Sequence, residues 1–383
     1  MKLIARTFAG LEDLLEKEIQ NFGGKNVKAH KRAVAFEGDQ RLMYKVNMFS
    51  RVALDVLTPI ARFEAKNPEQ LYREIQKINW GKYMSAEATF FISTIVYSSV
   101  FTHSQFVALK AKDAIVDQFR DAVGTRPDID KSRPDLRIVL RINETKCEVL
   151  LNSSGAPLFK RGYRTKTGAA PLNEILAAGI ILQTGWDKKK PFIDPMCGSA
   201  TIPIEAGMIA KNIAPCIVRN EYGFQKWKDY DENSYKELMK EAEASIQENR
   251  VVIKGFDQDL STLAIAKRNL KNVPQLIGNV TLEKADFFQS EKIFDHGIMV
   301  FNPPYDRRIA IYDADEFYAK IGTHLKHTFE GYDAWILSGN LMAIKRVGLK
   351  PSAKITLFNG AEECKLLHFS LYQGTKKGKF ERH

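Results

Sequence analysis

The tetrapeptide Asn302-Pro303-Pro304-Tyr305 is the segment whose residue types most clearly indicate chemistry. An amine attached to a purine or cytosine ring is a poor nucleophile, because its lone pair is delocalised into the ring. The side-chain oxygen of Asn302 and the carbonyl oxygen of Pro303 are two acceptors that could hold such an amine, with its lone pair aimed at an electrophilic methyl group. Two prolines stiffen the loop, and Tyr305 offers a ring on which an extruded base can stack. The segment therefore predicts an amine-binding catalytic loop, with a plain proline-rich turn as the alternative.

Three acidic residues, Asp194, Asp257 and Asp286, follow apolar strands in order along the chain. In an open α/β sheet, the carboxyl ends of the strands form the ligand crevice. We expect Asp257 to accept hydrogen bonds from a ribose diol. Asp286, which Phe287 and Phe288 follow, is expected to bind an adenine amine with an aromatic ring beside it. An isolated acid at a strand end is more often a helix cap, but three in succession favour a nucleoside pocket.

The turn after Asp194 opens a helix, whose amino terminus offers unpaired N–H groups to a carboxylate or a phosphate. The glycine spacing of the dinucleotide fingerprint, G-x-G-x-x-G, is absent from this turn. The adenosine is instead expected to lie with its far end toward the turn. The predicted ligand-binding residues are Asp194, Pro195, Cys197, Gly198, Ser199, Ala200, Thr201, Asp257, Asp286, Phe287 and Asn302.

The elements that must position these residues are apolar strands separated by helical periods, a pattern that predicts a parallel sheet buried on both faces. The strands are expected at residues 191–194, 251–257, 280–282, 297–301 and 334–337. Two closing strands, at 354–358 and 366–372, are separated by too short a break for a helical crossover, so we expect them to pair antiparallel. A polar, helix-prone insertion occupies residues 219–250, between the first two strands.

The first 165 residues have an α/β pattern of their own and most of the positive charge. Strands are expected at residues 3–8, 33–36, 89–96, 136–142 and 146–151, and helices at 11–22, 68–78 and 104–123. The chain has 57 Lys and Arg against 46 Asp and Glu, a net charge of +11, of which residues 1–165 contribute +8. Such an excess is typical of nucleic-acid-binding proteins, although it is also common as solubilising charge.

The composition excludes several classes of protein. With 44% hydrophobic and 27% charged residues, the chain is typical of folded proteins, and its 383 residues predict two or three domains. No stretch reaches the roughly 18 apolar residues of a membrane helix, and the charges of Lys2 and Arg6 argue against a signal peptide. A cytoplasmic protein without membrane contact is therefore expected. The four cysteines form no C-x-x-C pair, no metal site is expected, and we interpret His324 and His327 as a solvated helix face.

The order of these motifs resembles that of class I methyltransferases that use S-adenosyl-L-methionine. The tetrapeptide resembles the N-P-P-Y signature of those members that methylate exocyclic amines. More narrowly, residues 161–164 (RGYR), 171–178 (PLNEILAA) and 194–206 (DPMCGSATIPIEA) resemble the THUMP-domain RNA methyltransferases, which usually have Gly where this chain has Ala200. The resemblance implies S-adenosyl-L-methionine as the cofactor.

The same resemblance implies the domain organisation. The fold would be α/β: a Rossmann-like class I methyltransferase sheet, parallel with an antiparallel closing strand, preceded by a ferredoxin-like plus THUMP α/β region that binds RNA. The expected boundaries are residues 1–50 for the ferredoxin-like domain, 51–155 for the THUMP domain, 156–170 for a linker, and 171–383 for the methyltransferase domain.

Within this family, residues 101–106 and 222–227 are most similar to the enzymes that methylate guanine N2 in large-subunit ribosomal RNA. That similarity implies methyl transfer to a guanine N2 amine of 23S rRNA, in naked RNA or in a large-subunit assembly intermediate, by a protein expected to be a monomer. Three alternatives remain open: a tRNA guanine-N2 methyltransferase, a DNA adenine-N6 methyltransferase, and a catalytically inert RNA-binding assembly protein. The intact acids and Asn302 argue against the inert protein.

Overall fold

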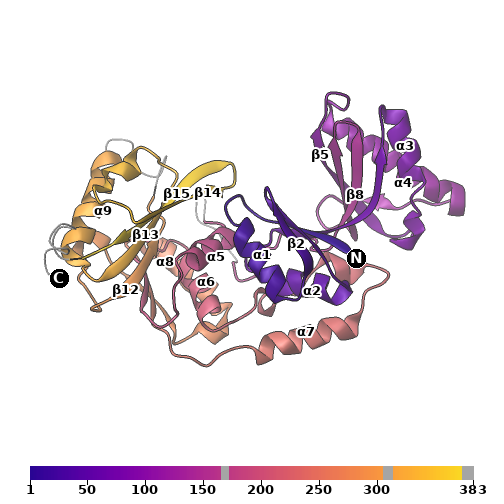
Figure 1. Cartoon of the computed structure of the whole chain (residues 1–383). Coiled ribbons are helices and arrows are strands. Elements are labelled where there is room, and N and C mark those ends of the chain that lie inside the picture. The colour runs from indigo at the N-terminus through magenta and orange to yellow at the C-terminus, as the bar shows by residue number, and fades with distance from the viewer. Residues whose placement is uncertain (165–171, 305–313, 373–383) are drawn as a thin grey trace. The chain divides into compact units, whose positions relative to one another are not determined.

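The computed structural model describes residues 1–164, 172–304 and 314–372, and its contacts divide the chain into two compact units (Figure 1). The first unit contains residues 1–7, 15–158 and 220–241, and the second contains residues 8–14, 159–219 and 242–383. Among the described residues, no helix is long and apolar enough to cross a membrane. The same residues contain no group of three or more His, Cys, Asp or Glu side chains placed to hold a metal ion.

The first unit is built on one eight-stranded sheet with the order β2-β3-β1-β4-β8-β7-β5-β6. Its strands are β1 (Lys2–Arg6), β2 (Lys25–His30), β3 (Ala33–Glu37), β4 (Asp55–Glu64), β5 (Thr89–Tyr97), β6 (Asp128–Ile129), β7 (Leu136–Asn143) and β8 (Lys146–Asn152). Strand β4 pairs antiparallel with β1 through its first residues and with β8 along most of its length. The two α/β sets expected before and after residue 50 therefore share one continuous sheet.

Helices α3 (Pro68–Gln76) and α4 (Ser104–Val123) cover one face of this sheet beside β5 and β8 (Figure 1). Their apolar side chains, including Leu71, Ile75 and Ile115, pack with alternate residues of β5, β7 and β8 in one core. The predicted bounds of α4 match the structure, and Gly124 ends the helix with a φ of 74°, a conformation that glycine adopts without strain. The remaining helices around the first sheet are α1 (Glu12–Asn21) and α2 (Gln40–Phe49).

The predicted insertion lies between β9 and β10 and contains α7 (Glu232–Ala244), but residues 220–241 fold with the first unit. The ring of Phe224 stacks on Tyr44 with 4.1 Å between centroids, and the backbone N–H of Asp231 donates to the Tyr44 hydroxyl at 3.0 Å. Phe224 is fully buried, and Lys45 forms an ion pair with Glu241 at 2.5 Å. Residues 220–241 of the insertion are therefore an integral part of the first unit, whereas residue 219 and residues 242–250 belong to the second.

The second unit is built on a seven-stranded sheet with the order β11-β10-β9-β12-β13-β15-β14. Its strands are β9 (Phe192–Asp194), β10 (Ile253–Asp257), β11 (Val280–Lys284), β12 (Gly297–Phe301), β13 (Tyr332–Ser338), β14 (Ala353–Asn359) and β15 (Glu362–Ser370). The strands from β11 to β13 in this order are parallel, whereas β15 pairs antiparallel with both β13 and β14. The predicted parallel sheet and its antiparallel closing strands are confirmed.

The helices of the second unit are α5 (Glu174–Gln183), α6 (Thr201–Ala210), α8 (Leu260–Lys271) and α9 (Ala314–Thr328). Short 3-10 turns complete the described chain: η1 (Trp80–Lys82), η2 (Pro215–Ile217), η3 (Gly223–Lys226), η4 (Pro274–Leu276), η5 (Phe287–Gln289) and η7 (Ala343–Val347). The interpretation of His324 and His327 as a solvated face of α9 is correct for His327, which is exposed, and wrong for His324. The His324 ring packs edge-on against Phe287 at 4.9 Å, because the aromatic residues of η5 lie against this helix.

Candidate functional site

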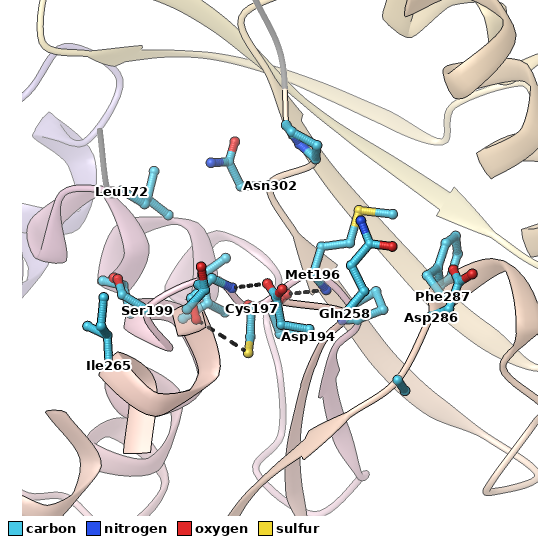
Figure 2. A pocket seen from close by; sticks show the side chains of 18 of the residues that line it. Leu172, Asp194, Met196, Cys197, Ser199, Gln258, Ile265, Asp286, Phe287 and Asn302 are labelled. Atoms are coloured by element: carbon cyan, nitrogen blue, oxygen red, sulfur yellow. Dashed lines mark hydrogen bonds between the residues drawn. The ribbon is translucent and has the colours of Figure 1, made fainter. Parts of the chain in front are cut away.

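A pocket of about 410 Å³ lies at the carboxyl ends of β9, β10, β11 and β12. In Figure 2, Asp286 and Phe287 lie on one side of this pocket, and Ser199 and Ile265 lie on the opposite side. The lining residues are Leu172, Asp194, Pro195, Met196, Cys197, Gly198, Ser199, Thr201, Ile202, Asp257, Gln258, Thr262, Ile265, Ala285, Asp286, Phe287, Phe288, Asn302, Pro304 and Phe317. Parallel strands end at one edge of the sheet, which is why residues about 100 positions apart meet here.

The turn from β9 into α6 brings the backbone to the pocket. Gly198, with a φ of 53°, lines the pocket and donates its N–H to the carboxylate of Asp257 at 2.9 Å. Ala200 is buried and has a φ of 64°, in the left-handed region that favours glycine. Ala200 also provides no side-chain cap for α6, so the first N–H groups of this helix point from its amino end without that partner. Such an end attracts a carboxylate or a phosphate.

Asp194 is almost completely buried beneath this turn. Burial raises the pKa of its carboxyl group well above the ordinary value, and the nearby charge of Asp257 raises this pKa further. The N–H of Met196, which donates to Asp194 at 3.2 Å, acts in the opposite direction. Asp194 therefore lines the pocket and also stabilises the turn by accepting the hydrogen bond from Met196.

Asp257 stands at the end of β10, with both carboxylate oxygens hydrogen-bonded to backbone. One oxygen accepts the N–H of Gly198, and the other accepts the N–H of Asp259 at 2.9 Å. Each carboxylate oxygen has two lone pairs, so acceptor capacity remains toward the pocket. The two hydrogen bonds fix the orientation of this carboxylate before any ligand arrives.

Asp286 follows β11 and accepts the N–H of Phe288 at 3.0 Å as it caps η5. Phe287, which sequence reasoning selected, is buried and stacks on Phe329 with 5.9 Å between centroids. Phe288 is more exposed and meets Phe317, another lining residue, edge-on at 5.5 Å. Phe288 is therefore the ring of this pair with more surface available to a planar ligand.

Asn302 follows β12 and lines the pocket together with Pro304. Its side-chain oxygen Oδ1 is buried and has no hydrogen-bond partner among the described residues. An unpaired buried acceptor costs about 1–3 kcal/mol, so this atom is suited to receive a donor from a ligand. Pro303 is buried and does not line the pocket, and Tyr305 lies outside the described residues.

Arg164 forms hydrogen bonds with two residues that line the pocket. Its guanidinium donates to the hydroxyl of Thr201 at 2.5 Å and to the carbonyl of Leu172 at 2.9 Å, and both of these residues line the pocket. It also forms an ion pair with the buried Glu174 at 3.5 Å. Arg164, the last residue of the segment 161–164 that resembles the family, therefore holds Leu172 and Thr201 in place beside the pocket.

The structure brings together ten of the eleven predicted ligand-binding residues: Asn302 and the nine residues Asp194, Pro195, Cys197, Gly198, Ser199, Thr201, Asp257, Asp286 and Phe287. Ala200 shapes the turn without lining the pocket. Sequence reasoning missed Gln258, although it directly follows the selected Asp257, and it left Phe288 out of the ligand-binding residues. Ile265 and Phe317 come from the faces of α8 and α9 and gave no local signal.

These features fit a nucleoside with a charged tail. Asp257 and Asp286 offer acceptors to hydroxyl and amine groups, Phe288 offers an aromatic surface, and the amino end of α6 offers N–H groups to an anionic tail. Because no described residue bonds Oδ1 of Asn302, this atom leaves an acceptor for a second molecule that reaches the pocket.

Three family models match the chain. The model described as RMKL-like, methyltransferase domain, matches residues 161–368, the THUMP domain matches residues 65–152, and the RlmL ferredoxin-like domain matches residues 2–57. Together these matches agree with the order of regions expected from the sequence.

Relatives match along nearly the whole chain. A putative RNA methyltransferase of Synechocystis sp. is 38% identical over 365 residues, which cover 95% of both chains. The ribosomal RNA large subunit methyltransferase K/L of Syntrophotalea carbinolica is 34% identical over 97% of this chain, but over 54% of its own length. The chain thus spans about half the length of the K/L relatives that it matches.

Two solved structures are similar over their full length. SMU.472, a putative methyltransferase complexed with S-adenosylhomocysteine (SAH), has a TM-score of 0.86 and 28% identity, and the match covers 98% of this chain and 99% of that one. A predicted N6-adenine-specific DNA methylase from Listeria monocytogenes has a TM-score of 0.85 and 26% identity, with 97% and 96% covered. The predicted fold is confirmed for both parts of the chain.

Proposed function

Because the chain belongs to the RMKL-like methyltransferase family, we propose that it is an RNA methyltransferase that transfers a methyl group to the exocyclic N2 amine of a guanine in 23S rRNA. S-adenosyl-L-methionine is the cofactor, as the family and the SAH complex of a structural relative establish. When bound, this cofactor supplies a methyl group on a positively charged sulfur. The remaining steps depend on the residues of this chain.

The residues of the pocket would hold the cofactor by three groups of contacts. Asp257, already oriented by Gly198, would accept hydrogen bonds from the ribose diol. Asp286 would accept from the adenine amine, with Phe288 beside the ring. The N–H groups at the start of α6 would receive the carboxylate of the methionine part.

The observation that carries this proposal is the buried Oδ1 of Asn302, which lies at the same pocket and has no partner within residues 1–164, 172–304 and 314–372. In the proposed reaction this atom accepts one hydrogen of the guanine N2 amine. The carbonyl of Pro303, the second acceptor expected from the sequence, belongs to a residue that does not line the pocket, so its contact with the amine stays a prediction. The nitrogen then presents its lone pair to the methyl carbon, and the C–N bond forms as the C–S bond breaks. The methylated amine releases one proton to water, so the chemistry depends on positioning and on fixed dipoles.

The choice of RNA rests on the first unit and on the relatives. A THUMP domain spans residues 65–152, and relatives at 34–35% identity are named for methylation of large-subunit ribosomal RNA. The basic excess of residues 1–165 is consistent with a phosphate-rich partner. The Listeria monocytogenes relative, whose name refers to adenine in DNA, has the same fold, so fold alone does not separate guanine from adenine.

The test is a comparison of modified nucleosides in cells with and without this protein. Ribosomal RNA and transfer RNA would be digested separately and analysed by mass spectrometry, and the purified protein would then be added to 23S rRNA from the deficient cells. We expect N2-methylguanosine to be missing from 23S rRNA and to be restored by the protein. Restoration of N6-methyladenosine instead, or loss of the modification from tRNA alone, would contradict the proposed substrate.

A further inference from the structure

A second cavity, of about 730 Å³, opens on the sheet of the first unit, far along the chain from the pocket described above. It is formed by four adjacent strands, β4, β8, β7 and β5. Its lining residues are Arg62, Phe63, Glu64, Tyr97, Arg141, Asn143, Lys146, Cys147 and Glu148. Cations and an aromatic ring therefore meet in one cavity of a sheet.

The alternation of side chains explains how charged residues gather on this sheet. On β8, Cys147 and Val149 pack in the core beneath α3 and α4, so Glu148 between them points to the opposite face. Arg141 stands directly across from Glu148 on β7, and Arg62 stands across from it on β4. The three residues therefore lie side by side on the face that α3 and α4 do not cover.

These residues form what we call the Arg-Glu-Arg cluster: Arg62, Glu148 and Arg141. Arg62 donates from Nε to Glu148 at 2.7 Å and also contacts it through Nη2 at 2.6 Å, and Arg141 forms an ion pair with the other carboxylate oxygen. The Glu148 side chain is only 7% exposed, whereas the side chains of Arg62 and Arg141 are 60% and 49% exposed. One buried carboxylate therefore fixes two guanidinium groups that still face solvent.

This arrangement leaves binding capacity on both arginines. A guanidinium has five N–H donors, and the contacts to Glu148 use one edge of each group. The remaining N–H donors are held in place, so they lose little side-chain entropy when they bind an anion such as a phosphate. Lys146 adds a third cation, and Glu64, its cross-strand neighbour, is the second acid in the cavity.

Tyr97 adds an aromatic ring to the same cavity as the arginines. It lies at the end of β5, lines the same cavity and is 73% exposed. With that exposure, most of the surface of the ring is available to a ligand. Exposed aromatic rings beside arginines are typical of surfaces on which unpaired bases stack.

We propose that this cavity binds an unpaired nucleotide segment of the RNA substrate, with phosphates on Arg62 and Arg141 and a base on Tyr97. The identification of the partner as RNA rests on the proposed function, whereas the position of the contact rests on the cavity itself. The cluster thereby holds the RNA at a place remote in sequence from the reacting guanine. Its loss should raise the KM for RNA and leave kcat nearly unchanged.

The experiment measures RNA affinity of the full chain by fluorescence anisotropy, with a labelled single-stranded 12-nucleotide RNA and with 23S rRNA as competitor. In the test variant Arg62→Gln, Glu148→Gln and Arg141→Gln are combined, so that no buried charge is left unpaired and the net charge falls by one. Lys77→Gln is the matched control, because it removes one charge from an exposed position on the helix side of the same unit. Thermal unfolding checks that all variants fold.

We expect the triple variant to bind RNA at least tenfold more weakly and the control to bind as the wild type does. Because two phosphate contacts are lost, the slope of log affinity against log salt should fall by about 1.4 for a single strand. A Tyr97→Ala variant should lose about 5- to 100-fold in affinity, which corresponds to one stacked base, with an unchanged salt slope.

The inference would be overturned if the triple variant bound RNA as tightly as the wild type, or if the Lys77→Gln control lost as much RNA affinity as the triple variant. It would also be overturned if the triple variant lost as much affinity for polyglutamate, an anionic chain without bases, as for RNA. The outcomes also separate this inference from the proposed function. If wild-type protein methylates 23S rRNA while the triple variant keeps its KM, the inference fails and the proposed function stands. If no methylated guanine forms but RNA binding depends on the cluster, the proposed function fails alone.

Discussion

Replacement of Asn302 by Leu separates a catalytic contribution of this residue from a structural one. Leu has nearly the shape of Asn but no acceptor. Oδ1 of Asn302 has no hydrogen-bond partner among the described residues, so the substitution breaks no described hydrogen bond at that atom. It removes a buried unpaired acceptor that costs about 1–3 kcal/mol, so the free energy of unfolding should stay equal or rise.

The effect on turnover should be opposite in sign. Loss of one preorganised hydrogen-bonding group in an active site typically costs about 10²–10³ in kcat, or about 2.7–4 kcal/mol of barrier. We expect a reduction of this size in single-turnover transfer of a tritiated methyl group to 23S rRNA, measured at saturating cofactor. Asn302→Asp is the matched variant, because it keeps an oxygen acceptor at the same place and should lose less activity.

Two further measurements decide what the loss of activity means. Isothermal titration with SAH should give similar affinities for wild type and Asn302→Leu, and urea unfolding should show no loss of stability. Turnover within twofold of the wild type would refute the role of Asn302 in binding the amine. A parallel collapse of SAH affinity or of stability would show that Asn302 supports the pocket and not the reaction.

Three other predictions concern the walls of the pocket. Asp257→Ala should raise the Kd for SAH in calorimetric titration about 10- to 100-fold, because it removes charge-assisted hydrogen bonds worth about 1.5–3 kcal/mol. Asp259→Ala removes only an exposed helix cap and should leave this Kd unchanged, so equal effects of the two substitutions would contradict the ribose contact. Arg164→Gln should lower the free energy of unfolding in urea by about 3–5 kcal/mol, because Glu174 is left buried without the cation of this ion pair. The double variant Arg164→Gln with Glu174→Gln should recover much of this stability, and no recovery would show that the broken ion pair is not the cause of the loss. The raised pKa of Asp194 predicts a contribution to stability that is complete below the unfolded pKa of about 3.9 and is lost as pH rises through the folded pKa. Asp194→Asn should therefore gain stability relative to wild type as pH rises above about 4, and a difference in unfolding free energy that does not change with pH would refute this.

Local sequence signals predicted the second sheet well. Strands β9 to β13 are short, apolar and separated by helices, and this pattern depends on burial of both faces of a parallel sheet. Because the carboxyl ends of parallel strands share one edge, the order of the strand-end acids was enough to place Asp194, Asp257 and Asp286 around one pocket. The same argument brought Asn302 to that pocket from the end of β12.

Strands of the first sheet were harder to predict. No residue of β2 (Lys25–His30) is buried, so this strand shows no apolar alternation, and β4 (Asp55–Glu64) contains Pro59 and an irregular register near it. The sequence also suggested two separate α/β sets, whereas β4 joins them by pairing with β1 on one side and β8 on the other. A strand in such a position is identified by its partners and not by its own pattern.

The sequence by itself therefore determined the elements that have strong local periodicity and the residues at their ends, and it predicts the chemistry of the Asn-Pro loop. The tertiary structure alone decided that Phe224 of the insertion stacks on Tyr44, that Ile265 and Phe317 face the pocket, and that Glu148 holds two arginines. The physical reason is the range of the interactions. Hydrogen bonds and apolar spacing within one element leave a local pattern, but contacts between side chains far apart in the chain exist only after the sheets have formed.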